Sequence, residues 1–375
     1  MKIVVTGAGG LLGWHAAARL HAANCAARFR REPAPHDIAP LNHAAFQDDA
    51  ALAAALSGAD AVLHFAGVNR GTEDQVRDGN PAIAQRLAHG CAVAGVRPHI
   101  VYANSTHARI DTVYGVSKRR AAEILAGAGG LTDMILPHIF GEGARPRYNN
   151  VTATFIAAVI AGESPQIDPN GRVHLLHAGA AAQMAIDAAL SRQTGEVVPE
   201  PRPTDVPWLF ATLQRFHADY AANLYPDLTD AFTRDLFNTY RAALYPAGFP
   251  RPLKLNTDPR GTLFEAAKGG GGGQTFLSWT KPGITRGDHF HLHKVERFLV
   301  LQGQAIIRIR RVLGGPVWEY RVSGDAPAPV DMPTLHTHSI QNIGDAPLLT
   351  LFWTHDLFDA AAPDTYFDPV LQAQT

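Results

Sequence analysis

The sequence predicts an α/β domain with a doubly wound parallel sheet, followed by an all-β barrel domain. With 375 residues, the chain is too long for one ordinary core and long enough for two. Its first part alternates short apolar runs with helical patterns, whereas its last part consists of short β-rich runs separated by Gly, Pro and Asp. The proline-bearing segment YPAGFPRP at 245–252 lies between them. We therefore expect one domain at residues 1–247 and a second at 248–375.

The composition excludes several classes of protein. Lys and Arg number 33 and Asp and Glu 34, so the net charge of −1 offers no basic footprint for nucleic acid or an anionic membrane. Cys25 and Cys91 are the two cysteines, too few for a disulfide framework and in keeping with a reducing cytoplasm. The sequence shows no basic-then-apolar leader, and no apolar run approaches the roughly 18–20 residues of a membrane span. The prediction is a cytoplasmic protein that binds neither nucleic acid nor membrane.

The first element is a strand at residues 2–6, KIVVT, which runs through a glycine turn into the helical pattern LLGWHAAARLHAA. In a dinucleotide-binding Rossmann domain the first glycine permits the tight turn, the second admits the pyrophosphate, and the third lets helix and strand pack closely. The N-terminus of the helix then offers free N–H groups to phosphate. A plain tight turn is the alternative. The predicted cofactor contacts here are Gly7, Gly10, Leu11, Leu12 and Gly13.

The second strand is expected around Ala26–Phe29, with Arg30 and Arg31 at its tip. An acidic residue at this place would bind the ribose hydroxyls of NAD, whereas arginine accommodates the 2′-phosphate of NADP. The pattern therefore favours NADPH, with Arg30 and Arg31 as cofactor contacts. A solvated basic turn is the alternative interpretation.

The third strand is expected in DAVLHFAGVNR, residues 60–70. It ends in the small residues Ala66 and Gly67, which would let the cofactor lie across the strand ends of a doubly wound sheet. Ala66 and Gly67 therefore join the predicted cofactor contacts.

The next strand, IVYANST at 100–106, precedes a helical segment with a Tyr-x-x-x-Lys pattern. Tyr114 and Lys118 are four residues apart and share one helix face. An ammonium group beside a phenol lowers its pKa, and the phenol can then exchange a proton with a carbonyl or alcohol. Ser105, at the end of the strand, can hydrogen-bond the same oxygen. The three residues together predict a carbonyl reductase or alcohol dehydrogenase site.

TGAGGLLG, HFAGVNR, Ser105 and the segment Tyr114–Lys118 resemble the extended short-chain dehydrogenases that act on nucleotide sugars. The resemblance implies Ser105, Tyr114 and Lys118 as the catalytic residues. Two segments depart from the family pattern: an expected Arg-x-Pro-Asn reads ILPH at 135–138, and an expected pair of aspartates is missing from HAGAA at 177–181.

Arg145 and Arg147 open the expected substrate-binding lobe in ARPRYNNVTATFIAAVI, residues 144–160. Guanidinium groups suit a diphosphate because each can donate two parallel hydrogen bonds. An exposed loop pair is the alternative. Amphipathic helical patterns complete this domain up to about residue 247.

A metal site is predicted in the second domain, from GITRGDHFHLHKVERFLVLQG at 283–303 and from PTLHTHSIQN at 333–342. His289 and His291 alternate along a strand and face the same way, Glu296 follows a short turn, and His338 comes from a later strand. Three imidazoles and one carboxylate suit Zn²⁺ or another divalent transition metal. Because the chain has 18 histidines, two satisfied histidines in a polar barrel interior are the alternative.

The spacing of these residues resembles the two conserved blocks of the cupin fold. Over nearly the whole chain, AGVNR, RYNNVTATF, DLFNTY, DPRGTLFE, KPGITRGDHFH and DTYF resemble the CapF-type bifunctional enzymes of capsular polysaccharide synthesis, in the route to UDP-N-acetyl-L-fucosamine. The resemblance implies a cupin that epimerises C3 of a UDP-4-keto-6-deoxy-N-acetylhexosamine. It also implies a reductase domain that reduces C4 with NADPH to a UDP-2-acetamido-2,6-dideoxy-L-talose. Cupins commonly pair, so we expect a homodimer. The motifs further predict substrate contacts at Asn69, Arg70, Arg145, Arg147, Asn149 and Arg260.

The base of the epimerase step is left open by the sequence. His289 could be the base, but a histidine bound tightly to metal cannot also serve as a free base. Lys294 is then the expected acid–base group, with His293, His336 and Tyr320 as further candidates.

Three other functions remain open. A rhamnose-type epimerase–reductase fusion would need no metal, and a C4 reductase could carry a purely structural cupin. A non-catalytic sugar-nucleotide sensor is the third.

Overall fold

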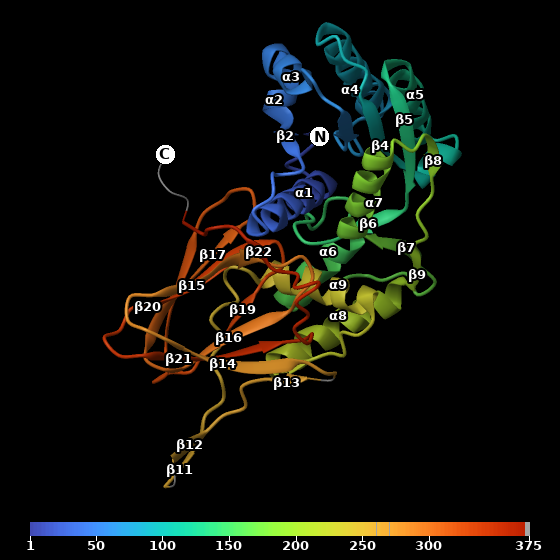
Figure 1. Ribbon diagram of the computed structural model, residues 1–375. Coiled ribbons are helices and arrows are strands. Elements are labelled where there is room, and N and C mark those ends of the chain that lie inside the picture. Colours follow the sequence, from blue (N-terminus) through green and yellow to red (C-terminus); the bar gives the residue numbers. More distant parts are fainter. Residues whose placement is uncertain (260, 270, 372–375) are drawn as a thin grey trace. The chain divides into compact units, whose positions relative to one another are not determined.

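The computed structural model describes residues 1–259, 261–269 and 271–371 (Figure 1). The chain forms two compact units by its contacts. The α/β unit comprises Met1–Val151 and Gly171–Asp205, and the β-rich unit comprises Thr152–Asn170 and Val206–Thr375. The expected boundary at residue 247 stays a prediction.

The α/β unit contains a six-stranded parallel sheet in the order β2-β1-β3-β4-β5-β8. Its strands are β1 (Lys2–Thr6), β2 (Asp37–Leu41), β3 (Ala61–His64), β4 (His99–Ser105), β5 (Gly130–Leu136) and β8 (Gly195–Val197). A smaller sheet contains β6 (His138–Phe140), β7 (Arg172–His177) and β9 (Arg202–Asp205). The helices are α1 (Leu11–Phe29), α2 (His43–Gln47), α3 (Asp49–Leu56), α4 (Glu73–Val93), η1 (Thr106–Arg109), α5 (Val113–Ala128) and α7 (Ala178–Ser191).

Helices cover both faces of this sheet. Successive side chains of its buried strands point to opposite sides, so both faces are apolar and both must be covered. Ile3 and Val5 of β1 belong to a core shared with α1 and α7. Val4, between them, belongs to a second core shared with α3, α4 and α5. The predicted doubly wound α/β architecture is thus confirmed.

The predicted strand at Ala26–Phe29 is wrong, because these residues form the last turn of α1. The alanine-rich sequence continues the helix, and Arg30 N–H donates to the carbonyl of Ala26 at 3.2 Å. The second strand begins only at Asp37. Arg30 and Arg31 therefore follow a helix and precede β2, at the amino-terminal edge of the sheet. A cofactor binds at the carboxyl ends of such strands, so the positional argument for these two arginines fails.

The β-rich unit contains two antiparallel sheets, in the orders β14-β21-β16-β19 and β18-β17-β20-β15-β22. Their strands are β14 (Gln274–Thr280), β15 (Thr285–Phe290), β16 (Glu296–Gln302), β17 (Gln304–Arg311), β18 (Trp318–Ser323), β19 (Val330–Met332), β20 (His336–Asn342), β21 (Leu348–Thr354) and β22 (Tyr366–Phe367). Side chains from both sheets, such as Phe298 of β16 and Ile307 of β17, share one apolar core. The predicted all-β second part is confirmed.

Further elements of this unit are α6 (Val151–Ala161), α8 (Val206–Ala221), α9 (Ala231–Leu244), β10 (Leu224–Tyr225), β11 (Asn256–Asp258), β12 (Gly261–Leu263) and β13 (Lys268–Gly269). Among the described residues, no helix is long and apolar enough to cross a membrane.

A buried ion pair fixes α8 and β10 to the strands of this unit. Arg297 of β16 and Asp331 of β19 pair through Nε–Oδ1 at 2.6 Å and Nη2–Oδ2 at 2.8 Å. The hydroxyls of Tyr220 and Tyr225 donate to the same carboxylate. Burial raises the pKa of Asp331, but Arg297 outweighs this and leaves the pKa well below its ordinary value. The arrangement also fixes the backbone beside Glu296, the residue that precedes Arg297.

Candidate active site and metal centre

The glycine turn after β1 has the close packing that the sequence predicts. Gly7 has φ +67°, and a Cβ there would lie 2.8 Å from the backbone nitrogen of Ala66. A Cβ on Gly13 would lie 2.2 Å from the carbonyl oxygen of Gly7, so helix and turn meet without room for a side chain. Gly10 caps α1 with no side-chain hydrogen bond, which leaves the first N–H groups to a ligand. The turn fits a dinucleotide phosphate.

The structure brings Ser105 and Tyr114 together at the carboxyl end of β4. Tyr114 lies in the first turn of α5 and shares a hydrogen bond with the side chain of Ser105. Ser105 Oγ also accepts from the N–H of His107 at 3.2 Å. A Cβ on Gly115 would lie 2.2 Å from the carbonyl of His107, so only glycine lets α5 approach η1 this closely.

Lys118, four residues after Tyr114 on α5, is buried. Its Nζ donates to the carbonyl of Ala103 at 2.6 Å and lies 4.2 Å from the centre of the Tyr102 ring. Burial lowers the pKa of Lys118 to about 7, partly opposed by Asp133. Burial raises the pKa of Tyr114, partly opposed by the Ser105 hydrogen bond. The expected lowering of the phenol pKa by Lys118 is therefore not seen, because the ammonium is directed at Ala103.

Two asparagines that the sequence analysis missed hold the active-site backbone. Asn104 donates to Asp133 Oδ2 at 3.0 Å and accepts from the N–H of Ser105 at 2.9 Å. Asn80 is buried in α4 and bonds both backbone groups of Val68, at 3.0 and 2.8 Å. Its amide also donates to Ser117 on α5, at 3.0 Å. No local sequence signal marks either residue, because Asp133, Val68 and Ser117 lie on other parts of the chain.

Five of the six predicted substrate contacts lie on two loops that meet, and four of the five make the hydrogen bonds between these loops. Arg70 Nη1 donates to the carbonyl of Arg147 at 3.0 Å, and Asn149 Nδ2 donates to the carbonyl of Asn69 at 3.3 Å. Arg145 is exposed on the second loop. Arg260 lies outside the described residues.

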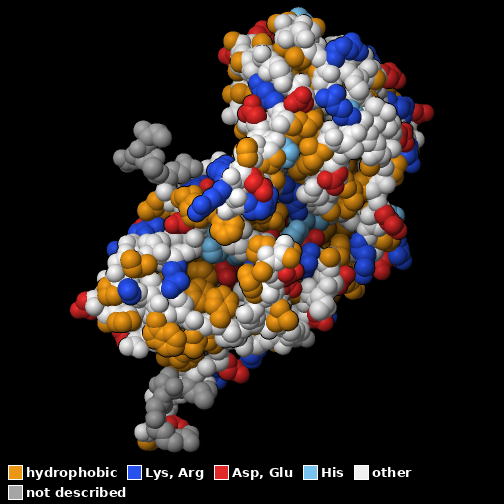
Figure 2. Space-filling view, viewed as in Figure 1, with side chains coloured by type: hydrophobic (Ala, Val, Ile, Leu, Met, Phe, Trp, Pro, Cys, Tyr) orange, Lys and Arg blue, Asp and Glu red, His pale blue; other side chains and the backbone are white. Residues whose placement is uncertain are grey.

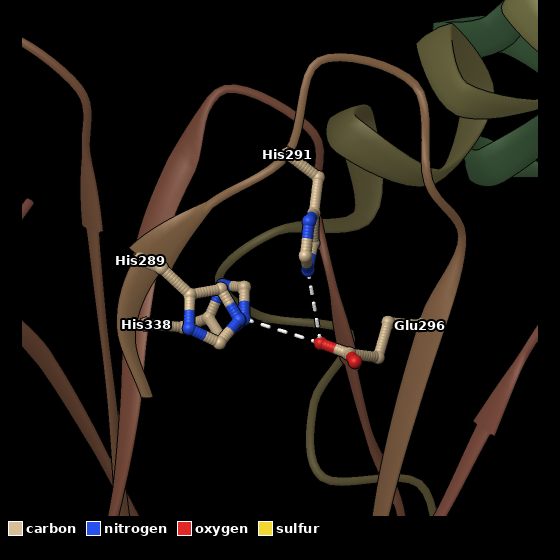
Figure 3. A group of neighbouring side chains, drawn as sticks. All are labelled: His289, His291, Glu296 and His338. Atoms are coloured by element: carbon tan, nitrogen blue, oxygen red, sulfur yellow. Dashed lines mark hydrogen bonds and ion pairs between the residues drawn. The ribbon is translucent and has the colours of Figure 1, made fainter. Parts of the chain in front are cut away.

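The four predicted metal ligands converge in the β-rich unit (Figure 3). His289 lies near the end of β15, His291 just beyond it, Glu296 opens β16, and His338 lies in β20. A β-bulge between Gly287 and His289 re-aims the end of β15. The metal-binding atoms of the four residues lie within 4.8 Å of one another. We call these four residues the barrel cluster.

The positions of the N–H groups in the barrel cluster indicate that it holds a cation. A neutral imidazole has one N–H, and His291 directs Nδ1 at the carbonyl of Asp364, at 2.6 Å. His338 likewise directs Nδ1 at the carbonyl of His336, at 3.1 Å. The two Nε2 atoms, presenting lone pairs, lie 3.1 and 3.2 Å from the same Oε2 of Glu296. Lone pairs facing a carboxylate oxygen repel each other unless both rings are protonated or a cation lies between them.

Protonation is the costlier of these two solutions, because charged rings would be buried side by side. The centroids of the His291 and His338 rings lie 5.2 Å apart. Burial lowers the pKa of His338, and it holds the pKa of His289 well below its ordinary value. A divalent metal fits the cluster because it accepts all four lone pairs and balances the carboxylate.

The expected acid–base groups of the barrel make contacts elsewhere. Lys294 Nζ donates to the carbonyl of Pro363 at 2.7 Å. The Tyr320 hydroxyl donates to the carbonyl of Pro246 at 3.1 Å, and burial raises its pKa to about 12. His293 Nδ1 lies 3.8 Å from Asp235, and His336 Nδ1 faces the carbonyl of Thr334 at 2.8 Å. A catalytic role for Lys294 or for any of the others stays a prediction.

A second cluster, unforeseen from the sequence, lies in the α/β unit and is called the helix cluster here. It consists of His15 on α1, Glu142 after β6, and His177 at the end of β7, with their metal-binding atoms within 4.8 Å of one another. His177 Nε2 lies 2.8 Å from Glu142 Oε2, and His15 Nε2 lies 3.0 Å from the carbonyl of Glu142. Burial lowers the pKa of His15 to about 3, although Glu142 opposes the shift.

The fold and the serine–tyrosine–lysine site define a domain of the short-chain dehydrogenase type, joined to a β-rich unit with a candidate metal centre. Residues 3–198 match the NAD dependent epimerase/dehydratase family, and residues 256–366 match the polysaccharide biosynthesis C-terminal domain.

Relatives resemble the chain along nearly its whole length. The UDP-2-acetamido-2,6-beta-L-arabino-hexul-4-ose reductase of Pseudomonas aeruginosa is 29% identical over 376 residues, covering 98% of both chains. The capsular polysaccharide assembling protein CapF of Staphylococcus aureus is 30% identical, with 99% of this chain and 100% of that chain covered and a TM-score of 0.57. A structure of CapF with the inhibitor 3-isopropenyl-tropolone covers the same shares at 30% identity and a TM-score of 0.52. The chain belongs to the NAD dependent epimerase/dehydratase family and, over its full length, to the CapF-type proteins.

Proposed function

We propose that the chain is a bifunctional nucleotide-sugar enzyme of polysaccharide synthesis. It epimerises C3 of a UDP-4-keto-6-deoxy-N-acetylhexosamine in the barrel and reduces C4 in the α/β unit, giving a UDP-2-acetamido-2,6-dideoxy-L-talose. The observation that carries the proposal is the presence of two sites in one chain: Ser105 with Tyr114 and Lys118, and the barrel cluster. The P. aeruginosa relative, which is named as a reductase of a UDP-linked 4-keto sugar, supports the reductase half.

The order of the two steps follows from the chemistry of the ketone. A carbonyl at C4 acidifies the neighbouring C3–H, so a base can remove that proton and the enolate can be reprotonated on the other face. Reduction of C4 removes this acidity. Epimerisation must therefore precede reduction.

In the reduction, a bound nicotinamide cofactor supplies the hydride. Tyr114 is placed to donate the proton to the C4 oxygen, and Ser105, already hydrogen-bonded to it, orients that oxygen. Lys118, four residues after Tyr114 on α5, would hold the nicotinamide ribose.

The proposed cofactor is NADPH. Arg30 and Arg31 lie at the amino-terminal edge of the sheet, away from the expected cofactor. The choice of NADPH therefore rests on the residue that follows the carboxyl end of β2. Asn42, the first residue after β2, is neutral, so no carboxylate follows the strand directly to repel a 2′-phosphate. Comparing kcat/KM for NADPH and NADH tests the choice, and a preference for NADH would overturn it.

The metal of the barrel is proposed to be Zn²⁺, which His289, His291, Glu296 and His338 would hold. A divalent cation there would polarise a ketone or fix the fold of the site.

A second candidate function, a C4 reductase with a structural barrel metal, is favoured by one observation. Each expected acid–base group of the barrel contacts another group, as Lys294 does with Pro363.

The variant Tyr114→Phe, which lacks the phenol hydroxyl, separates the two activities. We expect reduction to fall by about 100- to 10,000-fold, because the proton donor is lost. Exchange of the C3 proton in the barrel should be unchanged. NADPH oxidation and NMR of the sugar measure the two quantities, and retained reduction in Tyr114→Phe would contradict the assignment of the site.

The chain is also proposed to form a homodimer through the exposed strand β14. It is the edge of its sheet, and Leu277 and Trp279 are 49% and 64% exposed. Hydrophobic side chains gather on the surface where Figure 1 labels β14 and β21 (Figure 2). Such a patch marks an interface in many proteins. Light scattering tests the proposal, and a monomer would overturn it.

A further inference from the structure

The C-terminal segment 363–370, called the strap here, lies against the end of β15 that carries His289. Its strand β22 pairs with β15 at His289 and Phe290. Beyond β22, the N–H of Asp368 donates to the carbonyl of Asp288 at 2.8 Å, and the N–H of Val370 donates to Asp288 Oδ1 at 3.0 Å. The strap is therefore held at the end of β15 by β22 and by the residues that follow it.

Asp364, at the start of the strap, holds the turn between His291 and Glu296. Its carboxylate accepts three backbone N–H groups, from Leu292 at 3.0 Å, His293 at 2.9 Å and Lys294 at 2.8 Å. Three donors converging on one side chain define the path of a turn that has no regular secondary structure of its own.

The backbone of the same residue fixes the ring of His291. The carbonyl of Asp364 accepts the Nδ1–H of His291 at 2.6 Å, which leaves the Nε2 lone pair for a metal. Asp364 has φ +42°, in the left-handed region that Asp and Asn tolerate better than most residues. This conformation presents the carbonyl and the side chain to the same turn.

We propose that Asp364 is the positioning residue of the barrel cluster, pre-orienting His291 and the turn to Glu296 before metal arrives. This inference rests on the proposed metal site. It means that the strap helps the protein to retain the metal. Lys294 reinforces it by donating to Pro363, the residue before Asp364.

The substitution Asp364→Asn tests this role because it removes the negative charge while keeping size and tolerance of positive φ. We expect the Zn²⁺ affinity, measured by competition with a chromophoric chelator, to fall about 10- to 100-fold. The absorption of the Co²⁺-loaded variant should also change, because the turn from His291 to Glu296 loses the carboxylate that holds its N–H groups. The matched control is Asp359→Asn, which alters an exposed aspartate just before the strap and should keep wild-type affinity.

The outcomes separate this inference from the proposed metal site. Failure of the wild-type chain to bind Zn²⁺ would overturn both. Binding by the wild-type chain with equal affinity and an unchanged Co²⁺ spectrum in Asp364→Asn would overturn the inference alone. Equal losses of melting temperature in the metal-free and metal-loaded variant, with affinity retained, would show a merely structural role and also overturn it.

A measurement on the wild-type chain covers the case in which the variant does not fold. In the metal-free protein we expect slow hydrogen exchange at the amides of Leu292, His293 and Lys294, because Asp364 already binds them. Fast exchange that slows only when Zn²⁺ is added would show that the metal, rather than Asp364, orders the turn.

Discussion

The barrel cluster and the helix cluster contain the same residue types, yet different ring nitrogens of their histidines face the glutamate with an N–H or with a lone pair. In the barrel cluster, carbonyls accept the Nδ1–H groups of His291 and His338, so both Nε2 lone pairs face Glu296. In the helix cluster, Nε2–H groups on neutral rings can donate to the carbonyl and the carboxylate of Glu142. The barrel cluster therefore calls for a cation and the helix cluster does not. The groups around the histidines, more than the histidines themselves, distinguish a metal site from a buried polar network.

Removing one histidine from each cluster tests this difference most strongly. We expect His338→Ala to lower Zn²⁺ affinity by more than about 100-fold, because a metal ligand is lost. His177→Ala should keep the wild-type metal content. Elemental analysis after dialysis measures both. Loss of metal in His177→Ala would show that the helix cluster also binds a metal.

Exchanging each glutamate for glutamine should give opposite results in the two clusters. Glu142→Gln replaces the charged acceptor of His177 with a weaker, neutral one, and we expect the free energy of unfolding to fall by about 1 kcal/mol with unchanged metal content. Glu296→Gln should lower metal affinity. It should leave the metal-free protein at least as stable, because the glutamine amide can donate to a lone pair.

Urea unfolding of the metal-free chains and Zn²⁺ titration measure the two effects. A metal-free Glu296→Gln protein that is less stable than Glu142→Gln would contradict these positions of the N–H groups.

The pH dependence of stability concerns the neutral state of His15. Its folded pKa is about 3, below the ordinary value of 6.5, so the unfolded chain binds the proton first as pH falls. The stabilisation is complete above pH 6.5 and is lost as pH falls toward 3, by on the order of 2 kcal/mol between pH 6.5 and 5.

Urea unfolding of the metal-free protein between pH 7.5 and 5 measures this loss. His64, with a folded pKa also lowered to about 3 by burial, adds a similar contribution. The variant His15→Gln should therefore show a shallower dependence on pH. An unchanged slope would mean that His15 is not held neutral.

The features predicted well from sequence are those whose partners lie close along the chain. The Gly7 and Gly13 turn and the His289–His291 pair both act within a few residues. The α1 boundary was missed because alanine-rich Ala26–Phe29 suits a helix as well as a short strand. Whether such a segment forms a helix or a strand depends on the residues that pack around it.

Several residues that act at a distance along the chain were missed. Asp364 contacts the turn after His291 from more than 70 residues away, and the strap motif DTYF gave no indication of that contact. Glu142 and His177 meet because β6 and β7 pair, which no local pattern reveals.

The most direct test of the central claim is hydrogen exchange at C3 of the UDP-4-keto-6-deoxy sugar, in deuterated water without NADPH. We expect deuterium at C3 with the metal-loaded protein, followed by reduction at C4 once NADPH is added. Reduction without any C3 exchange would contradict it and leave a single-step reductase with a structural barrel.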